Sequence, residues 1–478
     1  MRRPGLLTWL VLALCLLGAL TAIDAAPAMA YSFAPPVHYG VGGRPADLVA
    51  ADLNGDGQPD LVTSAGSGID ILLGVGRGRL APGTRVPLEH RPGAIALADL
   101  DRDGNLDVVT ASTDGTVTVL LGDGAGSFVA KGAFPTGPYP TDVVAGDLTG
   151  DGVPDVATAD HDGDGLSILA GDGTGVLLAP LDLPVGADCA RVVAGDFNLD
   201  GRLDLAASRY SWEEYSGFGV LLGDGAGGFS APAFFETGNT DSSLHGLATC
   251  RLNQDSAPDL VALYGYEGGR MVALLGDGAG GFNKAASTVF SQGYDEAWGL
   301  AVADLNRDRL DDVVTIGQRP GYVTSSNGQQ VTVPPGPPRI YIMLSRGGGV
   351  SFEPTSFLAG RLPGAVIAAD FNGDGRPDLA TTDVETRSVS VRLNGHVPVL
   401  TGVSPSQGRI GDIVTLTGSH FSLRNGIVRF GAKSATAYLS RSSSTIRVRV
   451  PAGTANGRVK VTVTTLVGRT SPSYFFRL

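Results

Sequence analysis

A nine-residue acidic loop that recurs seven times constrains this 478-residue chain more than any other feature. Oxygen-bearing side chains occupy positions 1, 3, 5 and 9 of the loop, and glycine usually occupies position 6. The copies begin at residues 52, 99, 147, 196, 251, 304 and 370. Carboxylates at this density repel one another unless a cation neutralises them, and Ca²⁺ takes roughly six to eight oxygen ligands in flexible geometry. Glycine at position 6 permits the positive φ that wraps a loop around an ion.

Six of the seven loops are predicted to bind calcium, as structural ions that pin the loop and neutralise its carboxylates. The predicted ligands are Asp52, Asn54, Asp56 and Asp60; Asp99, Asp101, Asp103 and Asp107; Asp147, Thr149, Asp151 and Asp155; Asp196, Asn198, Asp200 and Asp204; Asp304, Asn306, Asp308 and Asp312; and Asp370, Asn372, Asp374 and Asp378.

Three loops depart from the pattern. Thr149 offers only a neutral hydroxyl at position 3, which predicts a weaker site. Arg309 replaces the glycine of the sixth loop and should strain the turn. Arg251 replaces the first Asp of the fifth loop, and its guanidinium can pair with Asp255 and Asp259 in place of a cation. We therefore expect the fifth loop to be free of metal.

The loops belong to repeats of about 50 residues that contain only strand signals. Each loop lies between two short apolar stretches, and a Gly-rich turn such as that in Leu-Leu-Gly-Asp-Gly-Ala-Gly-Gly-Phe follows about twenty residues later. Four short antiparallel strands per repeat predict the blade of a β-propeller, so seven loops predict seven blades. The last repeat stops after three strands, and the N-terminal stretch 33–39 can supply its fourth strand and close the ring.

The two ends of the chain differ from the repeats. Residues 1–30 combine an Arg pair, an apolar run and the sequence Ala-Met-Ala, which predicts a secretory signal peptide and no membrane span after its cleavage. Residues 31–396 form the predicted propeller. In residues 397–478, strict alternation of apolar and polar residues predicts a small immunoglobulin-like β-sandwich. The mature protein is expected to be extracellular, on the cell surface or in the periplasm.

The acidic loops and the Leu-Leu-Gly-Asp-Gly-Ala-Gly-Gly-Phe motif resemble the FG-GAP or VCBS repeats of integrin-alpha-like propellers, over roughly residues 31–396. The resemblance implies that Ca²⁺ lies in the first hairpin of a blade, with the backbone oxygen of position 7 as a further ligand. The C-terminal part resembles an IPT/TIG immunoglobulin-like domain. Such domains are usually spacers or contact modules.

A ligand is expected on the face opposite the calcium loops, because strand polarity places the long, irregular loops there. Aromatic residues concentrate in these loops, and rigid amphipathic rings dominate binding hot spots. The alternative is that the rings pack over sheet edges. The candidates are Trp212, Tyr215, Tyr264, Tyr266, Tyr294 and Trp298.

The sequence favours a non-catalytic recognition or adhesion protein for an extracellular glycan or protein. The alternatives are a polysaccharide-acting hydrolase or lyase, for which the same loops hold carboxylates, and a pure scaffold. The net charge of −13 reflects the loops, and nucleic-acid binding is disfavoured for want of a basic patch. Cys189 and Cys250 are expected to be buried free thiols.

Overall fold

The computed structural model describes residues 33–478 except 164, 187, 210–215, 240–243, 265–268, 290–295, 319–321, 327–328, 334–335, 347–350, 396–398, 420, 422–426, 443 and 465–472. These residues form 39 strands and no helix. In this part of the chain, accordingly, no helix could cross a membrane. The predicted signal peptide lies outside the described residues.

The described part of the repeat region contains seven four-stranded antiparallel sheets, one for each acidic loop. The first contains β2 (Pro45–Ala51), β3 (Asp60–Ala65), β4 (Gly68–Leu72) and β5 (Thr84–Pro87). The second contains β6 (Ile95–Ala98), β7 (Asp107–Ser112), β8 (Thr116–Gly122) and β9 (Phe128–Pro135). The third contains β10 (Pro140–Gly146), β11 (Asp155–Asp160), β12 (Gly165–Leu169) and β13 (Leu181–Pro184).

The next three sheets follow the same order. The fourth contains β14 (Val192–Gly195), β15 (Asp204–Arg209), β16 (Ser216–Leu221) and β17 (Ala233–Asn239). The fifth contains β18 (Leu244–Cys250), β19 (Asp259–Tyr264), β20 (Arg270–Gly276) and β21 (Phe282–Val289). The sixth contains β22 (Glu296–Ala303), β23 (Asp312–Gln318), β26 (Arg339–Arg346) and β27 (Ser351–Leu358), and a separate hairpin of β24 (Tyr322–Ser326) and β25 (Gln329–Val333) lies between its second and third strands.

The seventh sheet joins the two ends of the repeat region. It contains β28 (Val366–Ala369), β29 (Asp378–Asp383), β30 (Ser388–Arg392) and the N-terminal β1 (Val37–Gly40). Strand β1 pairs antiparallel with β30, so that Val37 lies opposite Val391 and Gly40 opposite Ser388. The N-terminal stretch thus completes the last sheet, as the sequence predicts.

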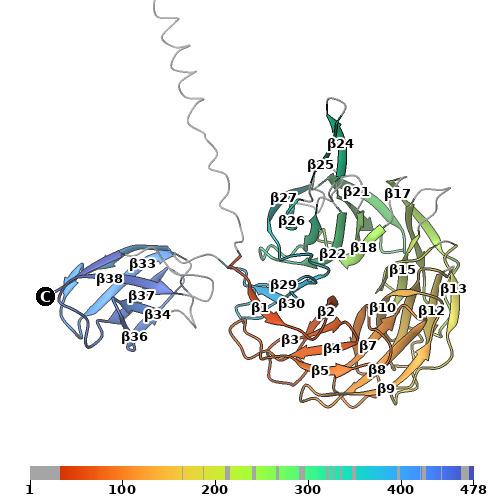
Figure 1. Cartoon of the computed structure of the whole chain (residues 1–478), viewed down its shortest axis with the longest axis horizontal. Coiled ribbons are helices and arrows are strands. Elements are labelled where there is room, and N and C mark those ends of the chain that lie inside the picture. Colours follow the sequence, from red (N-terminus) through yellow and green to blue (C-terminus); the bar gives the residue numbers. More distant parts are fainter. Residues whose placement is uncertain are drawn as a thin grey trace, which may run out of the picture.

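The sheets are arranged around a central axis, with the first strand of each sheet toward the centre and the fourth at the periphery (Figure 1). Because neighbouring sheets pack face to face, second strands such as β3, β7 and β11 are buried along their whole length. The outer β5 and β13 are largely exposed. Apolar side chains between sheets form the core; one such layer joins Val109 and Val119 of the second sheet to Val143 and Val156 of the third.

The C-terminal part is a sandwich of two sheets. One contains β31 (Val399–Ser404), β33 (Ile413–Ser419), β37 (Thr445–Arg449) and β36 (Tyr438–Arg441). The other contains β32 (Gln407–Gly408), β39 (Ser473–Arg477), β38 (Gly457–Thr464), β34 (Ile427–Phe430) and β35 (Lys433–Ser434). Alternate residues of β37 and β38 point into a core that includes Val448, Val461, Phe430 and Phe475.

Both cysteines of the described region are free and buried, as predicted. Burial raises the pKa of both the Cys189 and the Cys250 thiol. Neither thiol has the exposed, low-pKa character of a reactive cysteine.

Candidate functional site

The acidic loops connect the first and second strands of each sheet, all at one end of the ring. In the first loop, the Asp52 carboxylate accepts hydrogen bonds from the backbone amides of Asp56 (3.1 Å) and Gly57 (2.7 Å). The same arrangement holds Asp99, Asp196, Asp304 and Asp370 against positions 5 and 6 of their loops. These amide contacts hold the position-1 carboxylate against the turn of each of these loops.

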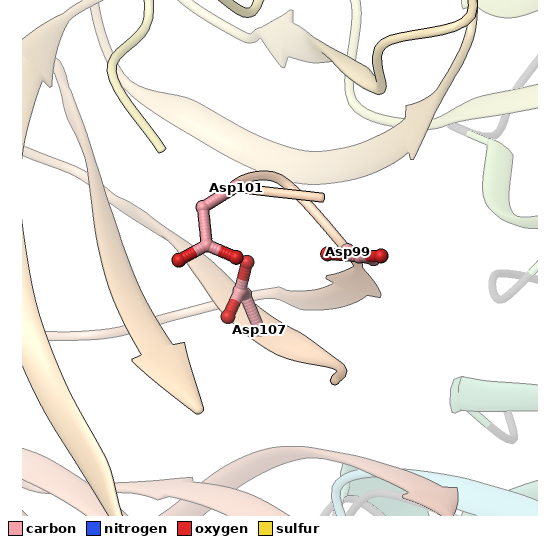
Figure 2. Close-up of side chains that lie close together, drawn as sticks. All are labelled: Asp99, Asp101 and Asp107. Carbon is pink, nitrogen blue, oxygen red and sulfur yellow. The ribbon is translucent and has the colours of Figure 1, made fainter. Parts of the chain in front are cut away.

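In the second loop three of the four predicted ligands come together, whereas Asp103 is not part of this group. Ligand oxygens of Asp99, Asp101 and Asp107 all lie within 4.8 Å of one another (Figure 2). Asp107 is fully buried, and Asp99 and Asp101 are half-buried. Three carboxylates at this separation repel one another strongly, and a hard cation among them would remove the repulsion. The donor set fits Ca²⁺, because it consists only of oxygens.

The third loop fits a cation for a different reason. Asp147 Oδ1 and Thr149 Oγ1 are buried without a hydrogen-bond partner. Buried polar atoms are nearly always paired, because an unpaired group loses its hydration without compensation. A cation at this loop would satisfy both oxygens, even though Thr149 is the weakest ligand in the predicted set.

Backbone conformation separates the fifth loop from the other six. In those six loops, positions 4 and 6 both have positive φ; in the sixth loop these are Arg307 (φ 67°) and Arg309 (φ 75°). The predicted strain at Arg309 is therefore present, because a non-glycine residue occupies the left-handed region. Neither Gln254 nor Ser256 of the fifth loop has positive φ.

The prediction that Arg251 pairs with Asp255 and Asp259 is wrong. No ion pair among the described residues joins Arg251 to either carboxylate, and the Arg251 residue is exposed. Instead, its backbone amide donates to Asp311 Oδ2 (2.8 Å), and its carbonyl accepts from the Asp311 amide (2.8 Å). Arg251 thus links two neighbouring sheets through its main chain.

The Asp at position 9, which the sequence pattern marks only as a calcium ligand, also accepts hydrogen bonds from two backbone amides. Asp60 accepts hydrogen bonds from the amide of Leu53 (2.9 Å) in its own loop and from the amide of Gly74 (2.5 Å) just beyond the third strand. In the fifth loop, Asp259 accepts from Leu252 (2.7 Å) and Gly276 (3.0 Å) in the same way. The equivalent carboxylates are Asp107, Asp155, Asp204 and Asp312.

The seventh loop modifies this arrangement. Asp378 accepts from the backbone amide of Asn394 (2.6 Å) and from the side-chain amide of Asn372, with N–O distances of 2.9 and 3.1 Å. Burial raises the pKa of Asp378 to about 8 and that of Asp312 to about 7. A nearby cation would favour the ionised form of both carboxyl groups.

The aromatic ligand candidates do not form a described surface patch. Trp212, Tyr215, Tyr266 and Tyr294 lie outside the described residues, as does the side chain of Trp298 in β22. The prediction that Tyr264 lies in a ligand-binding surface loop is wrong. Tyr264 is the last residue of β19, it is fully buried, and its hydroxyl forms a hydrogen bond with that of Thr237.

A cavity of about 350 Å³ opens at the centre of the ring and is lined by residues from all seven repeats. We call it the channel cavity. It includes, in every repeat, the residue five positions before the acidic loop. Because this residue and the acidic loop are at opposite ends of the inner strand, the cavity lies toward the face opposite the loops. Three of these residues are charged and four are small: Asp47, Asp142 and Arg191, and Ala94, Gly246, Gly299 and Ala365.

The charged residues of the channel cavity also connect neighbouring sheets. Asp47 Oδ2 accepts from the Ile95 amide (2.9 Å), and Asp142 Oδ2 accepts from the Val192 amide (3.1 Å). Arg191 Nε donates to the His245 carbonyl (2.7 Å). Burial raises the pKa of Asp142, and burial together with the nearby Asp142 charge raises the pKa of Asp47 to about 6.

Comparison with protein-family models identifies both parts of the chain. The model of the FG-GAP-like repeat matches residues 52–110, 99–158, 150–207 and 251–315, and the IPT/TIG domain matches residues 398–477. The chain is an FG-GAP-repeat propeller protein with a C-terminal IPT/TIG domain. This domain combination is that of a recognition or adhesion module.

Solved structures resemble the FG-GAP-repeat protein in fold. BBS1N in complex with ARL6DN, soaked with lead, has a TM-score of 0.50 at 12% identity, covering 76% of this chain and 96% of the other. An Agrocybe aegerita lectin with specific recognition of non-reducing terminal N-acetylglucosamine has a TM-score of 0.46 at 17% identity, with coverage of 74% and 96%. The WD40 β-propeller domain of Doa1 has a TM-score of 0.47 at 9% identity, with coverage of 76% and 96%. No curated protein matches the sequence.

Sequence reasoning missed the channel residues because they vary between repeats and form no motif. Aligning the seven repeats on the first residue of the acidic loop reveals them, since all seven then occupy one column.

Proposed function

We propose that this FG-GAP-repeat protein is a secreted, calcium-stabilised and non-catalytic recognition module. It binds an extracellular glycan or protein through the face opposite the calcium loops. The observation that carries the proposal is the channel cavity, where a half-buried cationic side chain and two carboxylates converge from different repeats. Ligand sites are typically concave, with a few convergent polar groups that fix orientation.

The two faces of the ring differ in how far their residues vary between repeats, and this difference supports the proposed function. The acidic loops keep oxygen side chains at positions 1, 3, 5 and 9 in six of the seven repeats, so the calcium proposed there serves six sheets alike. The equivalent position of the channel cavity is Asp, Ala, Arg or Gly depending on the repeat, and its charges are unevenly distributed: Asp47 and Asp142 come from the first and third repeats, and Arg191 from the fourth. An asymmetric arrangement of this kind can orient one ligand, in addition to the hydrogen bonds by which the same side chains join neighbouring sheets.

A screen of glycans and proteins in the presence of Ca²⁺ tests the proposal. A hit should be weakened at least tenfold by Ala365→Phe, which fills the cavity without changing charge, and by Arg191→Gln. Arg202→Gln is the matched control, because Arg202 is exposed in a calcium loop on the other face. Because Arg191 connects sheets, unfolding midpoints are recorded for all variants. Absence of any ligand, or a ligand indifferent to Ala365→Phe, would contradict the proposal.

One observation favours a polysaccharide-acting enzyme as the second candidate. Asp47 and Asp142 share the cavity, and both have raised pKa values, that of Asp47 about 6. Carboxyl groups with raised pKa values serve as general acids in glycoside hydrolysis. Release of reducing ends from a polysaccharide, abolished by Asp47→Asn, would establish the enzyme. Binding without turnover would establish the recognition module.

A further inference from the structure

The C-terminal sandwich has a charge opposite to that of the rest of the chain. Residues 397–478 contain eleven Lys and Arg and a single acidic residue, Asp412, which gives a net charge of +10. Since the whole chain has a net charge of −13, residues 1–396 have −23. The expectation that the chain lacks a basic patch therefore overlooks the sandwich.

The basic residues of one sheet gather on its outer face. Arg458 and Lys460 of β38 are exposed and alternate with the buried Val459 and Val461. Arg429 of β34 is exposed and lies opposite Thr462, which shares the face of Lys460 because the two are separated by two positions. Residues of neighbouring strands are about 4.8 Å apart, and alternate residues of a strand about 6.8 Å apart. Lys460 thus lies between Arg458, two positions away on its own strand, and Arg429, diagonally across on the next strand, and we call these three cations the basic face.

The basic face has no acidic counterpart. No ion pair among the described residues involves Arg429, Arg458 or Lys460. The one acidic residue of the sandwich, Asp412, accepts a hydrogen bond from the Arg409 amide (2.7 Å) at another edge. Like charges at this separation repel one another and oppose folding. A multivalent anion would remove that repulsion, and the other sheet adds the exposed Arg447 and Arg449 to the same positive field.

We propose that the basic face binds a linear anionic polysaccharide, so that the sandwich anchors the propeller to an acidic extracellular matrix. The proposal rests on the extracellular location in the proposed function, but not on a ligand of the channel cavity. The negative propeller would repel the same polymer, which directs it to the sandwich. The complex is therefore oriented, with the propeller held away from the polymer.

The surroundings of Tyr474 favour a polysaccharide over a nucleic acid. Tyr474 lies opposite Lys460, and the Arg458 guanidinium covers its ring at 3.8 Å from the centroid. Proteins that bind single strands stack bases on open aromatic rings. The Tyr474 ring is exposed, but the Arg458 guanidinium already occupies one of its sides, so that cations dominate the basic face, which suits a polymer recognised by its charge.

Dextran sulfate, carboxymethyl dextran and neutral dextran are suitable probes, because they share one backbone and differ in charge. The full-length protein with bound Ca²⁺ is titrated with each polymer at several salt concentrations. We expect both charged dextrans to bind and neutral dextran not to bind. Affinity should fall steeply with salt, because each neutralised anion releases counterions.

Two triple variants separate the basic face from net charge. The first variant combines Arg429→Gln, Arg458→Gln and Lys460→Gln. It should bind the charged dextrans at least tenfold more weakly. It should also reduce the slope of log affinity against log salt concentration by about two to three, roughly one for each cation removed. The control variant combines Arg79→Gln, Arg91→Gln and Lys131→Gln, which make the same charge change on exposed residues of the propeller. It should bind the charged dextrans as tightly as the wild type does. Since all six side chains are on the surface, the unfolding midpoints should stay close to that of the wild type.

Three results would overturn the proposal. The first is equal loss of affinity in both triple variants, and the second is binding of neutral dextran with the affinity of the charged polymers. The third is tighter binding of a DNA duplex than of dextran sulfate at equal charge concentration, which would assign the face to nucleic acid. None of these results depends on the channel cavity, whose ligand is tested by Ala365→Phe.

Discussion

The Asp259 carboxylate accepts a hydrogen bond from the Gly276 amide at 3.0 Å, in the one repeat whose acidic loop begins with Arg251. Its other oxygen accepts from the Leu252 amide at 2.7 Å. The position-9 carboxylate is therefore retained in the loop that is predicted to hold no calcium. We conclude that position 9 joins the acidic loop to the end of the third strand, independently of the ion.

Asp259→Ala should lower the free energy of unfolding by about 2–4 kcal/mol, because it leaves the buried Leu252 amide and the half-buried Gly276 amide without an acceptor. The loss should be the same in calcium and in EDTA, since the fifth loop is expected to hold no metal. Arg251→Ala, which keeps the main-chain contacts to Asp311, should change stability by less than about 0.5 kcal/mol. Chemical denaturation in both buffers measures these values. A loss confined to the calcium buffer would instead mean that the fifth loop binds the ion.

Asp103→Ala and Asp255→Ala compare position 5 in a loop predicted to bind calcium with position 5 in the loop predicted not to bind it. Asp103→Ala should lower the number of bound Ca²⁺ by one, because the remaining carboxylates cannot complete the coordination. Asp255→Ala should leave the number unchanged at about six. Native mass spectrometry counts the ions. Equal losses in the two variants would contradict the distinction between the loops.

EDTA should lower the unfolding midpoint of the wild type, since the carboxylates of Asp99, Asp101 and Asp107 would then repel one another without a cation. Differential scanning fluorimetry in EDTA and in Ca²⁺ measures the shift, with Mg²⁺ as the control for ionic strength. An unchanged midpoint would mean that calcium has no structural role.

The architecture was predictable because the acidic loop marks the turn between the first and second strands at a fixed register. The closing strand β1 was predictable for a related reason: the last repeat lacks a fourth strand, and an apolar N-terminal stretch is available. Tyr264 was misplaced because an aromatic residue beside glycines resembles a loop. Its equivalent in the first repeat is Ala65, thirteen positions after the loop begins, and both residues end a buried strand.

The double role of position 9 and the channel cavity were harder to predict. The sequence cannot distinguish an Asp that only binds an ion from an Asp that also accepts hydrogen bonds from backbone amides. The channel residues occur once per repeat among small residues, so that Asp47 and Arg191 have no local signal. Their significance depends on ring closure, which brings residues separated by more than a hundred positions to one cavity.

Arg309→Gly should raise the free energy of unfolding by about 1 kcal/mol, because Arg309 has φ 75° and only glycine adopts this region without strain. The exposed Arg309 side chain forms no ion pair among the described residues, so its removal should cost little. The gain should persist with Ca²⁺ bound, as thermal unfolding at fixed Ca²⁺ concentration can measure. A decrease would mean that the guanidinium contributes more than the backbone strain costs.

The raised pKa of Asp47 predicts that the stability of the folded protein depends on pH. The pKa of Asp47 is raised from 3.8 to about 6, chiefly by burial, so between these values the folded protein holds a proton that the unfolded chain has released. The stabilisation is therefore complete below pH 3.8 and is lost as the pH rises through about 6. The shift corresponds to at most about 3 kcal/mol, at ~1.4 kcal/mol per pKa unit. The raised pKa of Asp142 acts in the same direction, and the Arg191 charge opposes it.

The comparison of wild type with Asp47→Asn isolates this effect, because the amide oxygen can still accept from Ile95 and the calcium ligands titrate alike in both proteins. The wild type should lose stability relative to the variant between pH 4 and pH 6.5 and should run parallel to it above pH 7. Urea unfolding at constant Ca²⁺ gives the difference at each pH. A difference that is constant over this range would mean that Asp47 is ionised throughout, and the channel cavity would then be permanently negative at its first sheet. A positively charged ligand in the channel cavity should favour the ionised form of Asp47, so that its binding releases a proton near pH 6. Calorimetry of ligand binding in two buffers of different ionisation enthalpy would detect that proton.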